Sequence, residues 1–149
     1  MADIDNEGFS FSQSIYHEIG KLKRILNIRV IENVDLVENY THYAIRLELK
    51  PPKSEYSFYA NVPDSETQQM IFSMNSIIEK HTAKPPENYT ELLFASSEGF
   101  ITGAFWYKKD KKWLMYIKFS EQPESQMILE KSDYKKLLAI ITKASKIFS

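Results

Sequence analysis

The chain of 149 residues lacks several features that define whole classes of protein. It has no cysteine, which excludes disulfides, thiolate catalysis and cysteine-ligated zinc. No apolar run approaches the ~18 residues of a membrane-spanning helix. The acidic, polar start also lacks the basic and apolar segments of a signal peptide. We therefore expect a cytoplasmic protein with no membrane partner.

Glycine and proline are also scarce, at 4 and 6 residues, which argues against a long disordered tract. The length suits one domain, and hydrophobic residues make up an ordinary 43% of it. We predict a flexible tail over residues 1–8 and a single α+β domain over residues 9–149.

Signatures of catalysis are missing as well. The chain has no glycine-rich phosphate loop and no serine in a nucleophile elbow. His17, His42 and His81 lie far apart, with no spacing typical of metal ligands. We therefore predict that the protein is not an enzyme and uses no cofactor and no metal.

The apolar residues that are present predict both strands and helices. An N-terminal helix is predicted over residues 11–26 by a stripe at helical spacing, which consists of Phe11, Ile15, Ile19, Leu22 and Leu26. Alternating apolar residues predict strands over 43–49 and 56–62. Two amphipathic helices are predicted, one capped by Asp64 or Ser65 and the other capped by Ser132 or Asp133.

The elements after the first helix fall into two similar series. In residues 27–84, and again in 88–149, antiparallel strands precede one helix. Residues 45–52 also resemble residues 117–124, which suggests an internal duplication as a hypothesis. The predicted fold class is α+β, with two antiparallel β-meander-plus-helix units preceded by an N-terminal helix.

Charge is unevenly distributed between these series. The net charge of the chain is −1. Residues 1–99 carry 9 Lys and Arg against 15 Asp and Glu, whereas residues 100–149 carry 10 Lys against 5 Asp and Glu. A nearly neutral total argues against tight, non-specific binding of duplex DNA, which rests on many phosphate contacts. The basic C-terminal third still allows a local surface that binds anions.

The most informative stretch is residues 100–119, which read FITGAFWYKKDKKWLMYIKF. Two aromatic, apolar runs flank five polar residues, a pattern typical of a β-hairpin. The turn gathers four lysines next to tryptophan and tyrosine rings. Single-stranded nucleic acids are bound by this combination, because cations hold the phosphates and flat rings stack on the bases.

Alternation along the two runs predicts which side chains face solvent. The more apolar set should face the helices, which leaves Trp106, Tyr116, Lys108 and Lys118 on the outer face. The candidate nucleic-acid-binding residues are therefore Trp106, Lys108, Lys109, Lys111, Lys112, Tyr116 and Lys118. Three alternatives stay open: the rings form a second buried layer, they form an oligomer interface, or the lysines only keep a hairpin tip soluble.

The first series has a matching outer face of different character. Arg46 and Tyr59 are predicted to lie there beside Glu48 and Glu55. Because carboxylates repel phosphate, a solvated face of paired charges is the favoured interpretation.

Residues 126–138, QMILEKSDYKKLL, resemble a known family. A short last strand leads into a capped helix with an aromatic residue in its first turn and a leucine pair after it. This pattern, with the strand 113–119 before it, is similar to the C-terminal end of the transcriptional positive-cofactor-four family. The repeated strands-then-helix unit is similar to the Whirly proteins, although their lysine-rich strand motif is not matched. The direct resemblance covers residues 113–141.

The resemblance implies binding of single-stranded DNA or RNA on β-surfaces, with assembly through helices. We therefore expect a single-stranded nucleic-acid-binding protein that acts in transcription, replication or repair and forms a homo-oligomer. The alternative hypothesis is a protein-interaction module, or a dimer like the secretion chaperones, that binds no nucleic acid.

Overall fold

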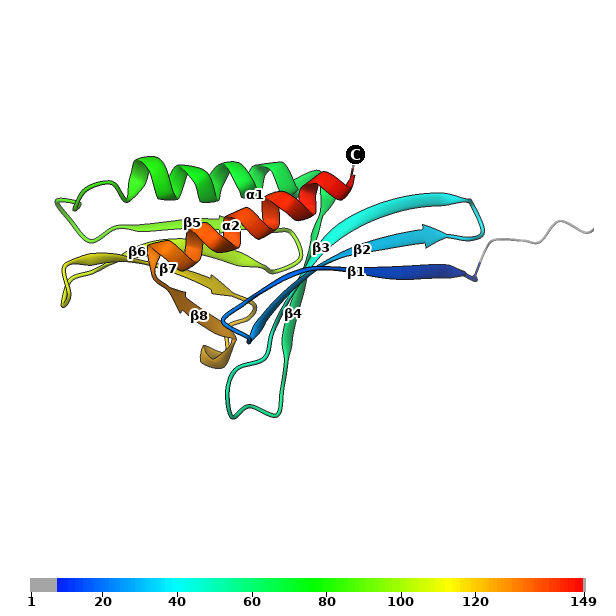
Figure 1. Cartoon of the computed structure of the whole chain (residues 1–149), viewed down its shortest axis with the longest axis horizontal. Coiled ribbons are helices and arrows are strands. Elements are labelled where there is room, and N and C mark those ends of the chain that lie inside the picture. Colours follow the sequence, from blue (N-terminus) through cyan, green and yellow to red (C-terminus); the bar gives the residue numbers. More distant parts are fainter. Residues whose placement is uncertain (1–7, 149) are drawn as a thin grey trace, which may run out of the picture.

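Residues 8–148 are described by a computed structural model, in which two antiparallel sheets and two helices alternate along the chain (Figure 1). The first half consists of β1 (Ser12–Leu22), β2 (Leu26–Asp35), β3 (Tyr40–Leu49), β4 (Phe58–Pro63), α1 (Asp64–Ser76) and a π-helical turn (Ile77–His81). The second half consists of β5 (Glu91–Ala95), β6 (Ile101–Tyr107), β7 (Lys112–Lys118), β8 (Gln126–Leu129) and α2 (Lys131–Ser145), with 3-10 turns at Pro123–Ser125 and Lys146–Phe148.

Each sheet is a four-stranded meander in which neighbours in sequence are neighbours in space. The fold is therefore α+β, as the sequence predicted. Four strands precede a helix in each half, while a duplication remains a hypothesis from the sequence. The predicted tail, residues 1–8, lies outside the described residues apart from Gly8.

The predicted N-terminal helix over residues 11–26 is wrong, because this segment forms β1 and the turn into β2. The register of β1 against β2 shifts between Glu18 and Gly20, which is a β-bulge at Ile19. A bulge moves the following residues to the opposite face of the strand. Ile15 and Leu22 are seven residues apart and would lie on opposite faces of a regular strand, but the bulge places them on the same face. Residues seven apart also share a face in a helix, so the sequence pattern looks helical.

The strands of the first sheet are set by alternation, as predicted. Ile45, Leu47 and Leu49 of β3 are buried, and so are their partners on the neighbouring strands, except for the half-buried Phe58 opposite Leu49. The intervening side chains, including Arg46 and Glu48, point to the other face. The first sheet thus has an apolar inner face and a polar, aromatic outer face.

The two helices cover the inner faces through the apolar stripes that the sequence showed. Met70 and Met74 of α1 are fully buried, as are Tyr134, Leu137 and Ile141 of α2. The predicted caps are wrong, because α1 follows Pro63 and α2 follows Glu130, and no described side chain caps either N-terminus.

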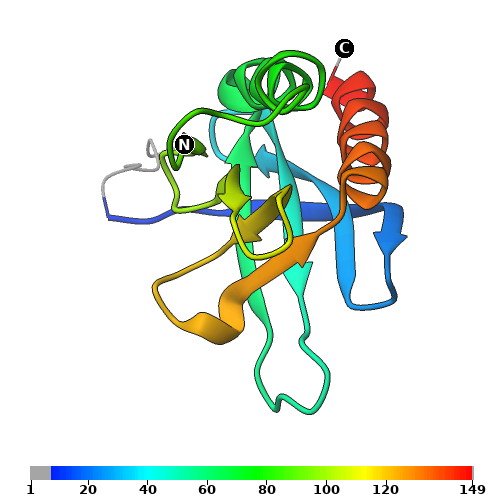
Figure 2. The same ribbon diagram turned by 90° about the vertical axis from the view of Figure 1, so that its left-hand side faces the viewer.

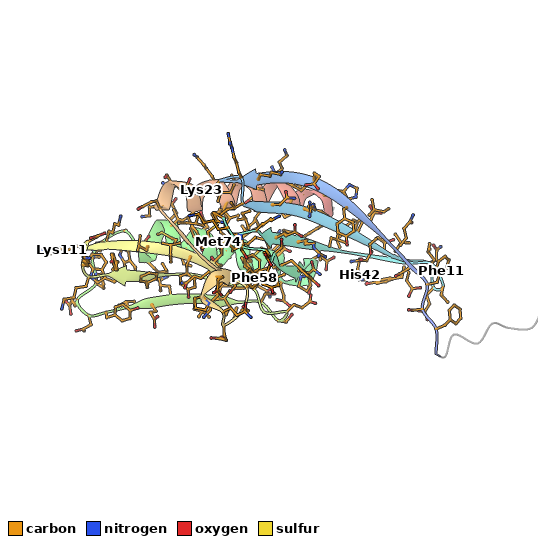
Figure 3. The ribbon with its side chains drawn as sticks, turned by 90° about the horizontal axis from the view of Figure 1, so that it is seen from below. Phe11, Lys23, His42, Phe58, Met74 and Lys111 are labelled. Carbon is orange, nitrogen blue, oxygen red and sulfur yellow. The ribbon has the colours of Figure 1, made fainter. Side chains whose placement is uncertain are left out.

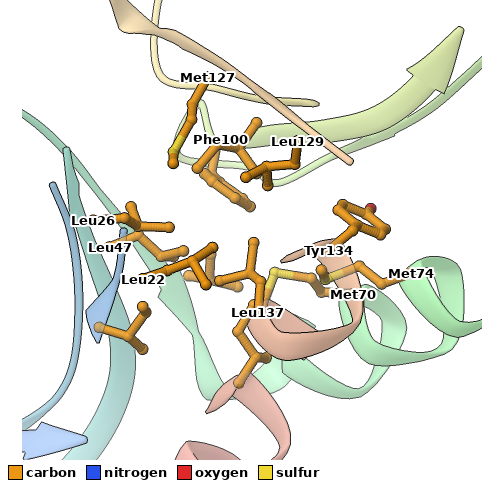
Figure 4. Close-up of a cluster of buried hydrophobic side chains, with 14 of the residues drawn as sticks. Leu22, Leu26, Leu47, Met70, Met74, Phe100, Met127, Leu129, Tyr134 and Leu137 are labelled. Atoms are coloured by element: carbon orange, nitrogen blue, oxygen red, sulfur yellow. The ribbon is translucent and has the colours of Figure 1, made fainter. Parts of the chain in front are cut away.

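One core lies between the two sheets and the two helices. Figure 4 shows Leu26 and Leu47 of the first sheet converging with Phe100, Met127 and Leu129 of the second half and with both helices. The two strand-and-helix units therefore share their hydrophobic interior rather than burying two separate ones.

The distal parts of β1, β2 and β3 project from this body as an arm (Figure 1). The tip of the β6–β7 hairpin, with Lys111, lies at the opposite end of the long axis from Phe11 (Figure 3). The β3–β4 loop projects away from the helices (Figure 2). No helix within residues 8–148 has both the length and the apolar character needed to cross a membrane.

Candidate functional site

The register of the β6–β7 hairpin decides which side chains share a face of the second sheet. Trp106 pairs with Trp113, and Gly103 pairs with Tyr116. Paired residues of antiparallel strands lie on the same face. Because Trp113 lies in line with the buried Met115 and Ile117, Trp106 belongs to the inner face with them.

The predicted position of Trp106 on the outer face is therefore wrong. Its ring centroid is 5.6 Å from that of Trp113, in an edge-to-face arrangement with an interplanar angle of 72°. The Trp113 indole Nε1 donates a hydrogen bond to the Lys84 carbonyl over 3.0 Å. The tryptophan pair thus joins the end of the hairpin to the loop after α1, which is a structural role.

Phe105 takes the outer position that Trp106 was expected to fill. Its ring centroid is 6.1 Å from that of Tyr116, so the two rings form one aromatic patch. Leu93 of β5 and Ile128 of β8 flank Tyr116 and are 63% and 45% exposed. A surface hollow of about 410 Å³ lies over this patch, between Tyr89 and Gln126. The outer face of the second sheet is therefore apolar and aromatic at its centre.

Gly103 allows the Tyr116 ring to lie across β6. A Cβ atom at position 103 would be 3.1 Å from the Tyr116 hydroxyl and only 1.9 Å from the Leu92 carbonyl oxygen. Partial burial raises the pKa of the Tyr116 phenol, and the nearby Glu91 carboxylate adds to this effect. Tyr116 is thus a neutral, partly covered ring at neutral pH.

The predicted lysines divide into two groups. Lys108, Lys109 and Lys111 are exposed at the hairpin tip and form no ion pair with any residue in the range 8–148. By contrast, the Lys112 ammonium lies 2.9 Å from the Glu130 carboxylate, and that of Lys118 lies 3.4 Å from the Glu121 carboxylate. The hydrogen bond to Glu130 raises the pKa of Lys112. Free positive charge is therefore concentrated at the tip.

The outer face of the first sheet holds residues that the sequence interpretation partly missed. Arg46 and Tyr59 lie there as predicted, and the Arg46 guanidinium is 3.9 Å from the centre of the Tyr59 ring. Tyr16 of β1 adds a second ring, 5.8 Å from the same guanidinium. Arg29 of β2 also lies on this face, opposite Arg46. The alternation of Leu26, Ile28 and Val30 marks Arg29 as outward, whereas Tyr16 was hidden by the predicted helix.

The carboxylates on this face are held by Arg29. The Arg29 Nε atom is 2.5 Å from a Glu18 carboxylate oxygen, and an Arg29 Nη atom is 3.8 Å from Glu48. The hydrogen bond from Arg29 lowers the pKa of Glu18, and the same bond raises the pKa of Arg29. The predicted pairing of charges thus involves Arg29, while Arg46 stacks on Tyr59.

The described residues hold no group of three or more His, Cys, Asp and Glu side chains placed to bind a metal ion. The chemistry available on both outer faces is stacking, hydrogen bonding and charge. No family model matches the sequence, and no curated protein matches it.

Proposed function

We propose that the protein binds single-stranded nucleic acid on the outer face of the second sheet. The observation that carries this proposal is the aromatic patch of Phe105 and Tyr116, which shares its sheet with the unpaired lysines of the hairpin tip. Bases stack on such rings, and Lys108, Lys109 and Lys111 are free to contact phosphates. Lys112 and Lys118 border the patch, but each is paired with a carboxylate. To bind a phosphate, they must first release Glu130 and Glu121, respectively.

The architecture agrees with this proposal. The rings lie on a sheet face that neither helix covers within the described chain, because both helices pack against the inner faces. A sheet face with rings and cations suits an extended single strand, whose bases are accessible. A duplex offers its phosphates instead, and three free lysines are few for that purpose.

The charge distribution sets the expected strength of binding. Each phosphate neutralised on a single strand contributes a slope of about −0.7 to the logarithm of affinity against the logarithm of salt concentration. Three tip lysines therefore predict a slope of about −2. This dependence is modest, so the bases must supply a large part of the affinity.

The test is a titration of a labelled 20-nucleotide strand with the protein at several salt concentrations. We expect salt-dependent binding, and we expect the charge-reversal variant Lys109→Glu/Lys111→Glu to weaken it and flatten its salt dependence. The matched control, Lys135→Glu/Lys143→Glu, makes the same change in net charge on exposed positions of α2. Equal affinities for the two variants, or no binding by the wild type at tens of micromolar, would contradict the proposal.

A second candidate function is assembly through the arm. At the free end of the arm, Phe11 and Leu36 are neighbours, joined by a hydrogen bond from the Leu36 amide to the Phe11 carbonyl. Phe11 is 61% exposed and Leu36 is 42% exposed, and Tyr40 nearby is 62% exposed. An exposed apolar cluster of this kind is typical of contact between copies of a chain. Sedimentation equilibrium of the wild type and of Phe11→Ser/Leu36→Ser tests this, and a monomeric wild type excludes it.

A further inference from the structure

The three buried side-chain atoms that have no hydrogen-bond partner in residues 8–148 are Asn27 Oδ1, Arg46 Nε and Asn61 Oδ1. All three residues belong to the outer face of the first sheet. Arg46 pairs directly with Asn61 across β3 and β4, and Asn27 pairs with Glu48 one row along. Buried polar groups are rarely left unpaired, so their concentration on one face requires an explanation.

The same face has the other features of a binding site. The Tyr59 ring is 58% exposed and already carries the Arg46 guanidinium on one side. Beside the β-bulge, a hollow of about 380 Å³ is lined by Glu18, Lys21, Asn27 and Arg29, among others. The unpaired atoms therefore lie next to both a flat ring and a recess.

Charge on this face favours a ligand that is recognised by its rings and polar edges rather than by phosphate. Arg29 and Arg46 are balanced by Glu18 and Glu48, and Arg29 contacts both carboxylates. The amide of Asn27 is also engaged, since its hydrogen bond to Glu18 helps to lower the pKa of that carboxylate, which leaves the Asn27 oxygen free. Lys21 adds only one further positive charge beside the hollow, so a phosphate would gain little from this face.

We propose that this face binds a nucleobase by its edge, with Arg46 Nε donating and Asn61 Oδ1 accepting a hydrogen bond. The exposed Tyr59 ring, which lies against the Arg46 guanidinium, moves aside to admit the base and stacks on it. Every base presents an acceptor and an N–H donor side by side on its pairing edge, so one base satisfies both atoms. This inference rests on the proposed function, and it makes the first sheet a second base-binding surface of the same protein. The first surface depends on the tip lysines, whereas this one depends on hydrogen bonds.

The experiment compares a 20-nucleotide strand of thymidines with an abasic strand of equal length and charge. We expect the wild type to bind the thymidine strand more tightly. Tyr59→Ala and Asn61→Leu should each reduce affinity for that strand about 5- to 150-fold, the range for the loss of one stacked or paired base. The salt dependence of binding should stay unchanged in both variants, in contrast to the tip variant.

Two controls separate this inference from the proposed function and from misfolding. Phe72→Ala removes a ring that is 70% exposed on α1 and should bind like the wild type. Asn61→Leu removes an unpaired buried oxygen, so its thermal midpoint should equal or exceed that of the wild type while its affinity falls. If Tyr59→Ala and Asn61→Leu bind like the wild type while the tip variant is weakened, this inference is wrong and the proposed function stands. If the wild type binds neither strand, both are overturned.

Discussion

Replacing Gly103 by alanine tests the geometry on which the aromatic patch depends. The new Cβ atom would lie 1.9 Å from the Leu92 carbonyl oxygen, which belongs to the backbone and cannot rotate away. Relief of this clash requires β5 and β6 to separate by about 1.5 Å, because ordinary contacts between such atoms lie near 3.5 Å. A shift of that size disrupts the hydrogen bonds around the pairing of Leu93 with Gly103.

The loss of stability follows from the number of bonds affected. Two or three backbone hydrogen bonds contribute about 1 kcal/mol each to the net free energy of unfolding, and forced overpacking costs a similar amount. We therefore expect Gly103→Ala to lower the free energy of unfolding by about 3 kcal/mol or more. It should also weaken binding to a single strand, since the Tyr116 ring can no longer lie across β6.

Urea unfolding monitored by tryptophan fluorescence is the appropriate assay, because Trp106 and Trp113 report directly on the second sheet. Gly20→Ala is the matched control. Its Cβ atom would lie 3.1 Å from a methyl group of Ile140, a side chain that can move. Alanine also restricts the unfolded chain, so Gly20→Ala should change stability by no more than about 1 kcal/mol. If the two variants are equally stable, the close approach of β5 to β6 is refuted, and with it the position of Tyr116.

Two further predictions concern buried and acidic groups. Tyr134→Phe removes a 2.8 Å hydrogen bond to the Thr102 hydroxyl, which keeps its bond to the Tyr116 carbonyl, so the variant should lose only about 1 kcal/mol in urea unfolding, and a loss above about 3 kcal/mol would contradict this. The Glu66 carboxylate accepts hydrogen bonds from Ser97 and Ser96, which lower its pKa below the ordinary value of 4.5. Its contribution to stability is therefore complete above pH 4.5 and is lost as the pH falls through the lowered pKa. Glu66→Gln should reduce the stability difference between pH 6 and pH 3, and an unchanged difference would show that Glu66 is not the group responsible.

The parts of the fold that follow simple alternation could be predicted from the sequence. The strands ending at Leu49 and Pro63, and the buried stripes of both helices, depend on period-2 or period-3.6 patterns over several residues. The first strand could not be predicted, since the bulge at Ile19 breaks its alternation and leaves a helical spacing. A bulge is fixed by pairing with β2, which is not visible in β1 alone.

The candidate site also contains residues whose positions could be predicted from the sequence and residues whose positions could not. The tip lysines are exposed as expected, because the turn between two strands projects from the end of the sheet into solvent. The predicted faces of Trp106 and Phe105 are reversed in the structure. Because both residues are large and aromatic, the alternation of apolar side chains does not show which of them faces the core. The pairing of Gly103 with Tyr116 determines which ring faces outward. This pairing depends on the close approach of β6 to β5 at Gly103. The roles of all these residues in binding remain predictions.

The single interior shared by both halves has a consequence for how a long strand would be held. Because Leu47 and Met127 belong to one hydrophobic cluster, this shared core fixes the two sheets relative to each other within residues 8–148. A polynucleotide that contacted both outer surfaces would have to adapt its own path to a fixed frame. The polynucleotide would therefore lose conformational entropy on binding, whereas the protein would lose little. The distance between the two surfaces would set the minimum length of a strand that contacts both.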